Sequence, residues 1–140
     1  MRPFEWSHEF SVSVPEIDAE HQAMFQVADG LHRTLIAGTP PGQAQPFIRE
    51  LAAHVTDHFS HEEHLMRASA YPLLAWHRRQ HAVAHGKIML LERRVRRGDR
   101  NAALLAMDLS VCLKNHIRLA DRMLCAYLRN HQRAQAALAS

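Results

Sequence analysis

Four stretches of the chain repeat apolar residues at spacings of three and four, which is the period of an amphipathic helix. They cover about residues 18–37, 41–66, 73–97 and 100–131. Turn-forming residues separate them, at Gly38-Thr39-Pro40-Pro41-Gly42, in the stretch 69–72, and at Gly98-Asp99. No long run alternates apolar and polar residues, as a half-buried strand would. The pattern therefore predicts four helices and no sheet.

Short connections between these helices imply that neighbouring helices run antiparallel. We expect an all-α, up-down-up-down four-helix bundle that forms a single domain of residues 1–140. Asp18 is a favourable N-cap for the first helix, so residues 1–17 are expected to form an extended arm that closes over one end of the bundle. The inward face of the fourth helix is expected to include Met123 and Tyr127.

Histidines and carboxylates occupy positions on the faces that should point into the core. His58 and Glu62 are four residues apart and so project from one face of the second helix. His77 and His81 repeat this spacing on the third helix. Buried imidazoles and carboxylates are costly unless they are paired or bind a metal. The inward polar residues of the four helices are His21, His58, Glu62, His77, His81, His116 and Asp121.

This set predicts a metal centre, because facing helices of a bundle are where such sites are built. A lone inward histidine would more often be a hydrogen-bonded core residue, but five converge here. Seven ligands exceed the four that a structural zinc ion takes, whereas five imidazoles and two bridging carboxylates suit two metal ions. Imidazole with carboxylate suits iron among other transition metals, and the absence of an inward thiolate pair argues against a structural zinc site.

One spacing in this set is irregular. His116 and Asp121 are five residues apart, which is about 140° around an ideal helix. For both side chains to reach one centre, either the helix widens locally into a π-type turn or Asp121 leans back. A regular helix would instead point Asp121 toward solvent and remove one bridge.

Composition and charge argue against a membrane protein and against a nucleic-acid-binding protein. Hydrophobic residues make up 47% of the chain, and no apolar run approaches the roughly 20 residues that span a bilayer. Much of the positive charge behind the net +3 lies in an arginine run around Gly98, where cations complement the end of a helix and no aromatic residues interleave with them. We therefore expect no membrane and no nucleic-acid partner. The opening residues lack the apolar core of a signal peptide, which predicts a cytoplasmic location, and nothing requires an oligomer, so a monomer is expected.

The same residues resemble the hemerythrin family, most closely its bacterial single-domain members. The resemblance runs through nearly the whole chain, and all seven ligand positions occur in the family's order. It is carried by Trp6-Ser7, residues 14–21, His58-Phe59-Ser60-His61-Glu62-Glu63, Met66, Tyr71-Pro72, His77, His81, residues 113–117 and Asp121.

The resemblance implies a pair of non-haem irons, bridged by two carboxylates and by an oxo or hydroxo group. The implied ligands are His77, His81 and His116 for one iron, His21 and His58 for the other, and Glu62 and Asp121 for the bridges. The iron with two histidines would keep an open position for dioxygen. Leu113 and Ile117, with Cys112, are expected to line the oxygen pocket. The implied function is reversible dioxygen binding for carriage, storage, delivery or sensing rather than catalysis.

The sequence departs from the bacterial pattern near the expected centre. Cys112 stands where a tryptophan is usual, His54 where a tyrosine is usual, and Ala84 where a phenylalanine is common. Ser13 replaces a frequent glycine. Because three of these changes remove an aromatic side chain, we expect a roomier and wetter pocket and faster autoxidation.

The alternative function is a di-iron enzyme that acts on peroxide or nitric oxide, or a ferroxidase. Ferritin-like enzymes use paired Glu-x-x-His motifs on bundle helices, and here that motif occurs only from Glu5 to His8, outside the bundle. The ferroxidase alternative is therefore disfavoured. Most of the remaining histidines and Glu63 are expected to lie in solvent; these histidines are His8, His32, His61, His64, His85 and His131.

Overall fold

The computed structural model describes residues 2–38 and 40–139, so Thr39 of the predicted first turn and both terminal residues lie outside the description. The long helices are α1 (Pro15–Ile36), α2 (Gln45–Ala68), α3 (Leu74–Arg96), α4 (Ala102–His116) and α5 (Arg122–Ala139). Two short 3-10 helices, η1 (His8–Phe10) and η2 (Pro41–Ala44), precede α1 and α2. A π-helical segment, η3 (Ile117–Asp121), joins α4 to α5.

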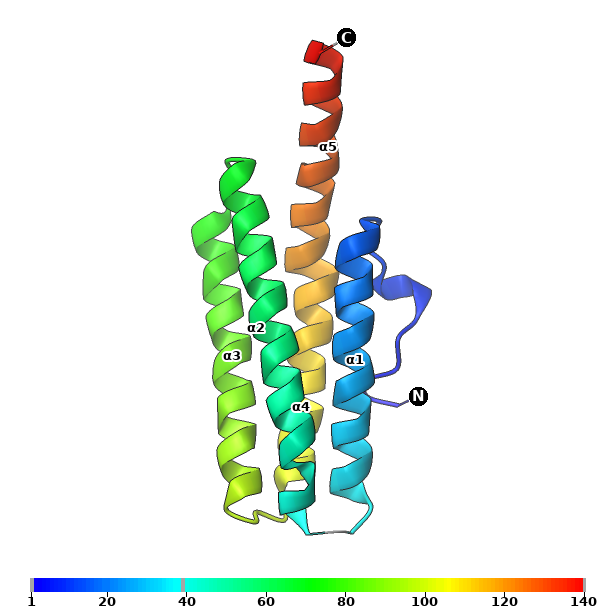
Figure 1. The fold of residues 1–140 in the computed structure, drawn as a ribbon, viewed down its shortest axis with the longest axis vertical. Helices are drawn as coiled ribbons and strands as arrows, with labels where there is room; N and C mark the ends of the chain where they lie inside the picture. Colours follow the sequence, from blue (N-terminus) through cyan, green and yellow to red (C-terminus); the bar gives the residue numbers. More distant parts are fainter. Residues whose placement is uncertain (1, 39, 140) are drawn as a thin grey trace.

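The helices form the predicted bundle. Figure 1 shows α1, α2, α3 and the helix made by α4, η3 and α5 packed together, each running opposite to its neighbour in the chain. The all-α, up-down-up-down four-helix architecture is therefore confirmed. The end of α5 rises above the other helices, and the N-terminal arm lies beside α1 (Figure 1).

The apolar faces of the four helices meet in one main core. Each contributes a leucine with no exposed surface, namely Leu31, Leu51, Leu91 and Leu109. Burial of one such side chain stabilises the fold by about 1.5–3 kcal/mol. Among the described helices, none is both long and apolar enough to cross a lipid bilayer.

The first helix begins at Pro15, three residues before the predicted start at Asp18. Proline suits the first position of a helix because its fixed φ is helical and its missing N–H needs no partner there. Asp18 instead lies in the first turn, where its carboxylate accepts hydrogen bonds from the Val12 amide (2.9 Å) and the Ser11 hydroxyl (2.7 Å). Ser13 has a φ of +60°, a left-handed conformation that favours glycine.

The fourth helix is longer than predicted, since α5 continues to Ala139 rather than ending near residue 131. Its last residues are rich in alanine and glutamine, which are good helix formers. The inward position predicted for Met123 is wrong, because this side chain is 38% exposed while Leu124 and Cys125 are buried. The π segment supplies the reason: it holds one residue more than a regular turn and rotates the helix beyond it.

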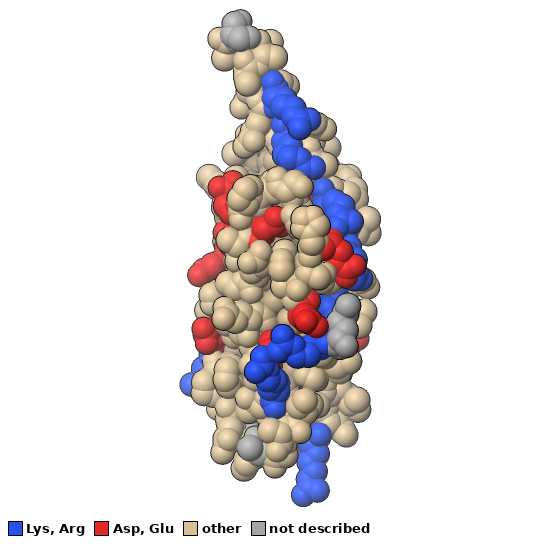
Figure 2. Space-filling view, turned by 90° about the vertical axis from the view of Figure 1, so that its right-hand side faces the viewer, with Lys and Arg blue, Asp and Glu red and all other residues tan. Residues whose placement is uncertain are grey.

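Arginines of the fourth helix hold the N-terminal arm. Arg118 and Arg122 donate hydrogen bonds to the carboxylate and carbonyl of Glu9, at 2.9 and 2.7 Å, and Arg129 donates to the carbonyl of Val12. Figure 2 shows basic side chains that follow α5 toward the arm. Phe10 is buried under these contacts, so the arm covers one side of α1 and η3.

Candidate metal centre

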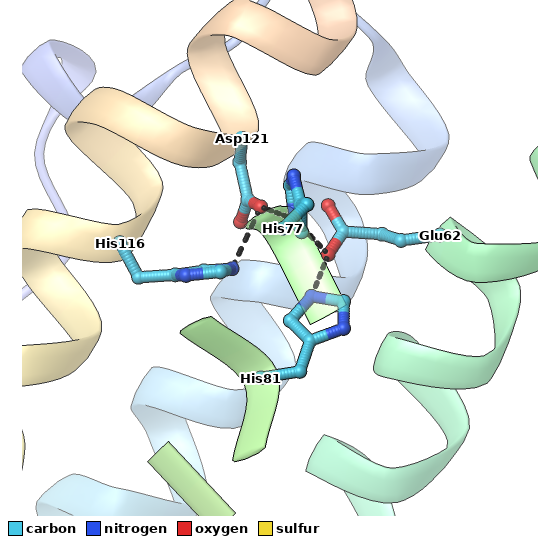
Figure 3. A group of neighbouring side chains, drawn as sticks. All are labelled: Glu62, His77, His81, His116 and Asp121. Atoms are coloured by element: carbon cyan, nitrogen blue, oxygen red, sulfur yellow. Dashed lines mark hydrogen bonds and ion pairs between the residues drawn. The ribbon is translucent and has the colours of Figure 1, made fainter. Parts of the chain in front are cut away.

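All seven side chains predicted as ligands converge inside the bundle. They come from α1, α2, α3, α4 and η3, and each is at least 92% buried. Figure 3 shows five of them, which point at a common space: His77 and His81 from α3, Glu62 from α2, and His116 and Asp121 from the continuous helix of α4 and η3. The structure thus brings together His21, His58, Glu62, His77, His81, His116 and Asp121.

The seven residues divide into two overlapping groups, each with candidate ligand atoms within 4.8 Å of one another. Both carboxylates belong to both groups. One group has three imidazoles and the other has two: His77, His81 and His116, and His21 and His58. The residues could therefore hold two metal ions that share Glu62 and Asp121.

Asp121 presents one oxygen to each group. Its Oδ1 lies 2.9 Å from Nε2 of His116 and 3.1 Å from Nε2 of His77. Its Oδ2 lies 2.8 Å from Nε2 of His21. This division of the two oxygens is what a bridging carboxylate requires. Glu62 contributes Oε1, which lies 2.9 Å from Nε2 of His81.

Several polar atoms that face this space lack a hydrogen-bond partner. Oε2 of Glu62, Oδ1 of Asp121, and Nε2 of both His77 and His116 are buried without a hydrogen-bond partner, although several lie close to an opposite charge. Each unsatisfied buried polar atom costs about 1–3 kcal/mol. Nitrogen and oxygen lone pairs that point at one space suit a transition-metal ion, which would satisfy them together.

The fourth helix widens where the sequence spacing requires it. The segment Ile117–Asp121 is π-helical, and both His116 and Asp121 are buried at the cluster. A π turn lets residues five apart share a face. The prediction of an irregular turn between these two residues is confirmed, and the alternative of a solvent-facing Asp121 is wrong.

Two carboxylates that sequence reasoning missed hold the outer nitrogens of the imidazoles. Oε1 of Glu20 lies 2.6 Å from Nδ1 of His58, and its other oxygen lies 2.7 Å from Nδ1 of His61. Oε2 of Glu63 lies 3.0 Å from Nδ1 of His81, and Arg78 pairs with its other oxygen at 3.2 Å. These contacts place the proton on Nδ1 and leave Nε2 free for a metal.

The expectation that Glu63 lies in solvent is therefore wrong, and His61, one of six histidines of which most were expected in solvent, is only partly exposed. The side chain of Glu63 is 20% exposed and that of His61 is 35% exposed. Neither residue lies on the inward face of α2. His61 contacts Glu20 of α1, and Glu63 contacts His81 of α3. One feature of the sequence could have indicated these two carboxylates: Glu20 and Glu63 directly adjoin the candidate ligands His21 and Glu62.

The role of Glu63 gives a testable prediction. Glu63→Gln keeps the side chain's shape but removes the charge beside His81, so we expect metal affinity to fall 10–100-fold. Competition with a chelator of known affinity measures the change. Glu50→Gln is the matched control, because Glu50 is exposed on the same helix and pairs only loosely with His54 at 3.8 Å. Equal affinities for the two variants would contradict the role given to Glu63.

Without metal, protons balance the charge of the cluster. Removal from water lowers the pKa of His58, but the carboxylates of Glu62, Asp121 and Glu20 outweigh this effect and raise the pKa to about 10. Burial also lowers the pKa of His77, and the carboxylates of Asp121 and Glu62 raise it to about 9. Imidazolium ions thus stabilise the buried carboxylates of the metal-free protein.

We expect the free energy of unfolding of the metal-free protein to fall between pH 7 and pH 10. An imidazolium whose pKa is raised by folding stabilises the fold fully below its unfolded pKa of about 6.5. This contribution is lost as pH rises through the folded values of about 9 and 10. Denaturant unfolding at three pH values measures the slope. The metal-loaded protein should show a smaller slope, because metal-bound imidazoles carry no such proton; equal slopes would contradict this interpretation.

The three residues predicted for an oxygen pocket have different surroundings. Leu113 is buried in the main core with Phe59, whereas Ile117 is buried beneath the arm with Phe10. Cys112 is half-buried and lines a groove of about 70 Å³ between α3 and α4 that reaches His116. Burial raises the pKa of the Cys112 thiol, which makes it a weaker nucleophile.

Aromatic side chains remain near the cluster, although Cys112, His54 and Ala84 stand where the family usually has aromatic residues. Phe59 stacks on the imidazole of His81 with ring centroids 3.8 Å apart, and Trp6 lies 6.3 Å from the ring of His21. Ala84 is buried in the core, but the side chain of His54 is 40% exposed. His54 lines neither of two hollows that reach the cluster: the groove at Cys112, which reaches His116, and a hollow of about 310 Å³ between α2 and α3, which reaches His81.

Comparison with known proteins is consistent with this geometry. The family described as "Hemerythrin HHE cation binding domain" matches residues 12–128. The chain is also similar to a protein named "Bacteriohemerythrin" from Stenotrophomonas maltophilia (strain R551-3), with 27% identity over 128 residues. That match covers 90% of this chain and 82% of the relative. All seven candidate ligands and η3 lie inside the region that the family matches.

Proposed function

Because the chain belongs to the hemerythrin family, we propose that its buried cluster holds two iron ions and binds dioxygen reversibly. The observation that carries this proposal is the pair of overlapping ligand groups that share Glu62 and Asp121. Three imidazoles would hold one iron and two imidazoles the other: His77, His81 and His116, and His21 and His58. The unequal number would leave the second iron with a free position for a small ligand.

An iron pair supplies the electrons that reversible dioxygen binding needs, and an oxo or hydroxo bridge would complete its coordination. The chain's own contribution is to fix the ligands and to keep water away. Glu20 and Glu63 orient two of the imidazoles through their Nδ1 atoms. Leu113 and Ile117 flank His116 in the sequence and are 1% and 2% exposed, so each presents an apolar barrier on its side of the helix.

The test is an optical spectrum of the anaerobically reduced protein before oxygen is admitted, after it is admitted, and after it is removed. We expect charge-transfer bands that appear with oxygen and disappear when oxygen is withdrawn. Immediate and irreversible conversion to the ferric form would favour catalysis and contradict reversible binding.

A second candidate function is a di-iron enzyme that acts on peroxide or nitric oxide. The groove beside Cys112 favours it, because a small oxidant could reach His116 from the surface there. Turnover of peroxide or nitric oxide by the reduced protein, without a stable oxygenated form, is the result that would select this alternative. The cytoplasmic location expected from the sequence stays a prediction.

The same groove gives a prediction about oxygen retention. Cys112→Trp places a large apolar ring between Trp76, Val83 and Leu119, and we expect the oxygenated form to decay several-fold more slowly because less water reaches the cluster. Stopped-flow absorbance measures the decay. If the variant decays as fast as the parent, Cys112 does not mark the route of water.

A further inference from the structure

The outer face of the fourth helix carries a line of exposed apolar side chains. Their exposure ranges from 38% for Met123 to 69% for Leu104. Successive members are three, four, eight and four residues apart, so they lie along one side of the helix. We define this outer stripe as Leu104, Met107, Val111, Leu119 and Met123.

Single exposed apolar residues are ordinary on a protein surface, whereas an aligned set marks an interaction surface. If full burial of one side chain removes on the order of 100 Å² of apolar surface, the outer stripe and the adjoining Val83 offer roughly 300 Å². A standard interface buries about 800 Å² per partner, and much of its rim is polar. The outer stripe is therefore large enough for the apolar centre of a modest interface.

Four of the five members of the outer stripe are placed symmetrically about Leu113, and the fifth, Val111, would face the exposed Asn115 of an antiparallel partner. Leu104 and Met107 lie nine and six residues before it, and Leu119 and Met123 lie six and ten residues after it. The extra residue of η3 brings Met123 back to the height of a ninth residue in a regular helix. An identical helix laid antiparallel across this face would place Leu104 on Met123 and Met107 on Leu119.

From this symmetry we infer that the outer stripe binds a second copy of the same chain, through two antiparallel fourth helices related by a two-fold axis near Leu113. A self-complementary patch is what a two-fold dimer requires. The flank toward α3 carries the Lys87–Asp108 ion pair, with 2.6 Å between Nζ and Oδ2. That pair is neutral overall and adds no like-charge repulsion. The modest area predicts a reversible dimer, although nothing in the sequence alone required an oligomer.

Sedimentation velocity of the iron-loaded full chain over a range of concentrations tests the inference. We expect the weight-average mass to rise from monomer toward dimer with concentration. Val111→Glu puts two like charges near the two-fold axis and should keep the chain monomeric. Met89→Glu is the matched control, since Met89 is 41% exposed on α3 outside the outer stripe, and it should dimerise like the parent.

Two results would overturn the inference. The parent could stay monomeric at every concentration, or Val111→Glu could dimerise as well as the parent. A parent that stays monomeric but sediments with lipid vesicles would show that the face docks on a membrane. Val111 is 55% exposed, so Val111→Glu should fold normally, and an unchanged thermal midpoint verifies this.

Crosslinking tests the antiparallel arrangement. In a Cys112→Ala background, a Leu104→Cys variant is mixed with a Met123→Cys variant under a mild oxidant; Cys125 has no exposed surface. The antiparallel dimer predicts a disulfide between the two variants, because a disulfide needs Cα atoms within about 7 Å. It predicts none between two Leu104→Cys chains, whose Cα atoms would be about 27 Å apart. Crosslinking of Leu104→Cys with itself would show a parallel pair and contradict the inference.

The dimer would also cover the groove beside the cluster, because Leu119 belongs to the outer stripe and lines that groove with Cys112. We expect the rate at which a thiol reagent labels Cys112 to fall several-fold as the concentration enters the dimer range. Val111→Glu should show no such change. This readout does not depend on oxygen chemistry, so its failure and failure of the proposed function are distinguishable.

Discussion

Replacing Asp121 with asparagine is expected to lower the iron content from two ions per chain to one or none. Asp121 belongs to both ligand groups and gives one oxygen to each. Asparagine keeps the shape but has only one oxygen and no charge, so it cannot bridge two cations. Loss of one partner from a buried charged cluster also costs about 3–5 kcal/mol of stability.

Iron analysis of the purified variant and denaturant unfolding measure the two effects. Asp108→Asn is the matched control, because Asp108 lies on the same continuous helix but is 58% exposed and pairs with Lys87 at the surface. Its loss should cost less than about 1 kcal/mol and leave the iron content unchanged. Two irons in Asp121→Asn would show that this carboxylate does not bridge.

Leu113→Ala is expected to lower the free energy of unfolding by about 2–5 kcal/mol and to shorten the life of the oxygenated form at least tenfold. The cost in stability comes from lost burial and from the cavity left behind. The faster decay would come from water that enters this cavity three residues from His116. Both effects are measured on one preparation, by denaturant unfolding and by stopped-flow absorbance.

Leu109→Ala separates the two effects. Leu109 is one turn earlier on α4, has no exposed surface, and packs in the same core as Leu113. We expect a similar loss of stability but an unchanged rate of decay, because the new cavity lies farther from the cluster. Equal acceleration in both variants would mean that general loosening of the core, and not water beside His116, controls the decay.

The sequence was sufficient to predict the four-helix architecture and the seven residues of the cluster. Polar groups that recur on an apolar helical face are costly unless they are paired or bind a metal, and five histidines on such faces are hard to explain otherwise. The five-residue spacing from His116 to Asp121 was informative for the same reason, since only a widened turn brings both into one core.

Features that depend on contacts between elements were beyond the sequence. Glu20 and Glu63 lie off the inward faces, and their roles follow from imidazoles on other helices. The position of Met123 depended on how the π turn rotates the helix beyond it. The residues that extend α5 to Ala139 have high helix propensity, but none of them is buried, so no inward face predicts this extension.

Metal analysis of the purified chain tests the central claim most directly. If one cluster of seven side chains holds a shared pair of ions, the protein should contain two irons per chain and lose both with chelation. The cluster consists of His21, His58, Glu62, His77, His81, His116 and Asp121. A chain that takes up a single zinc ion and ignores iron would contradict the account.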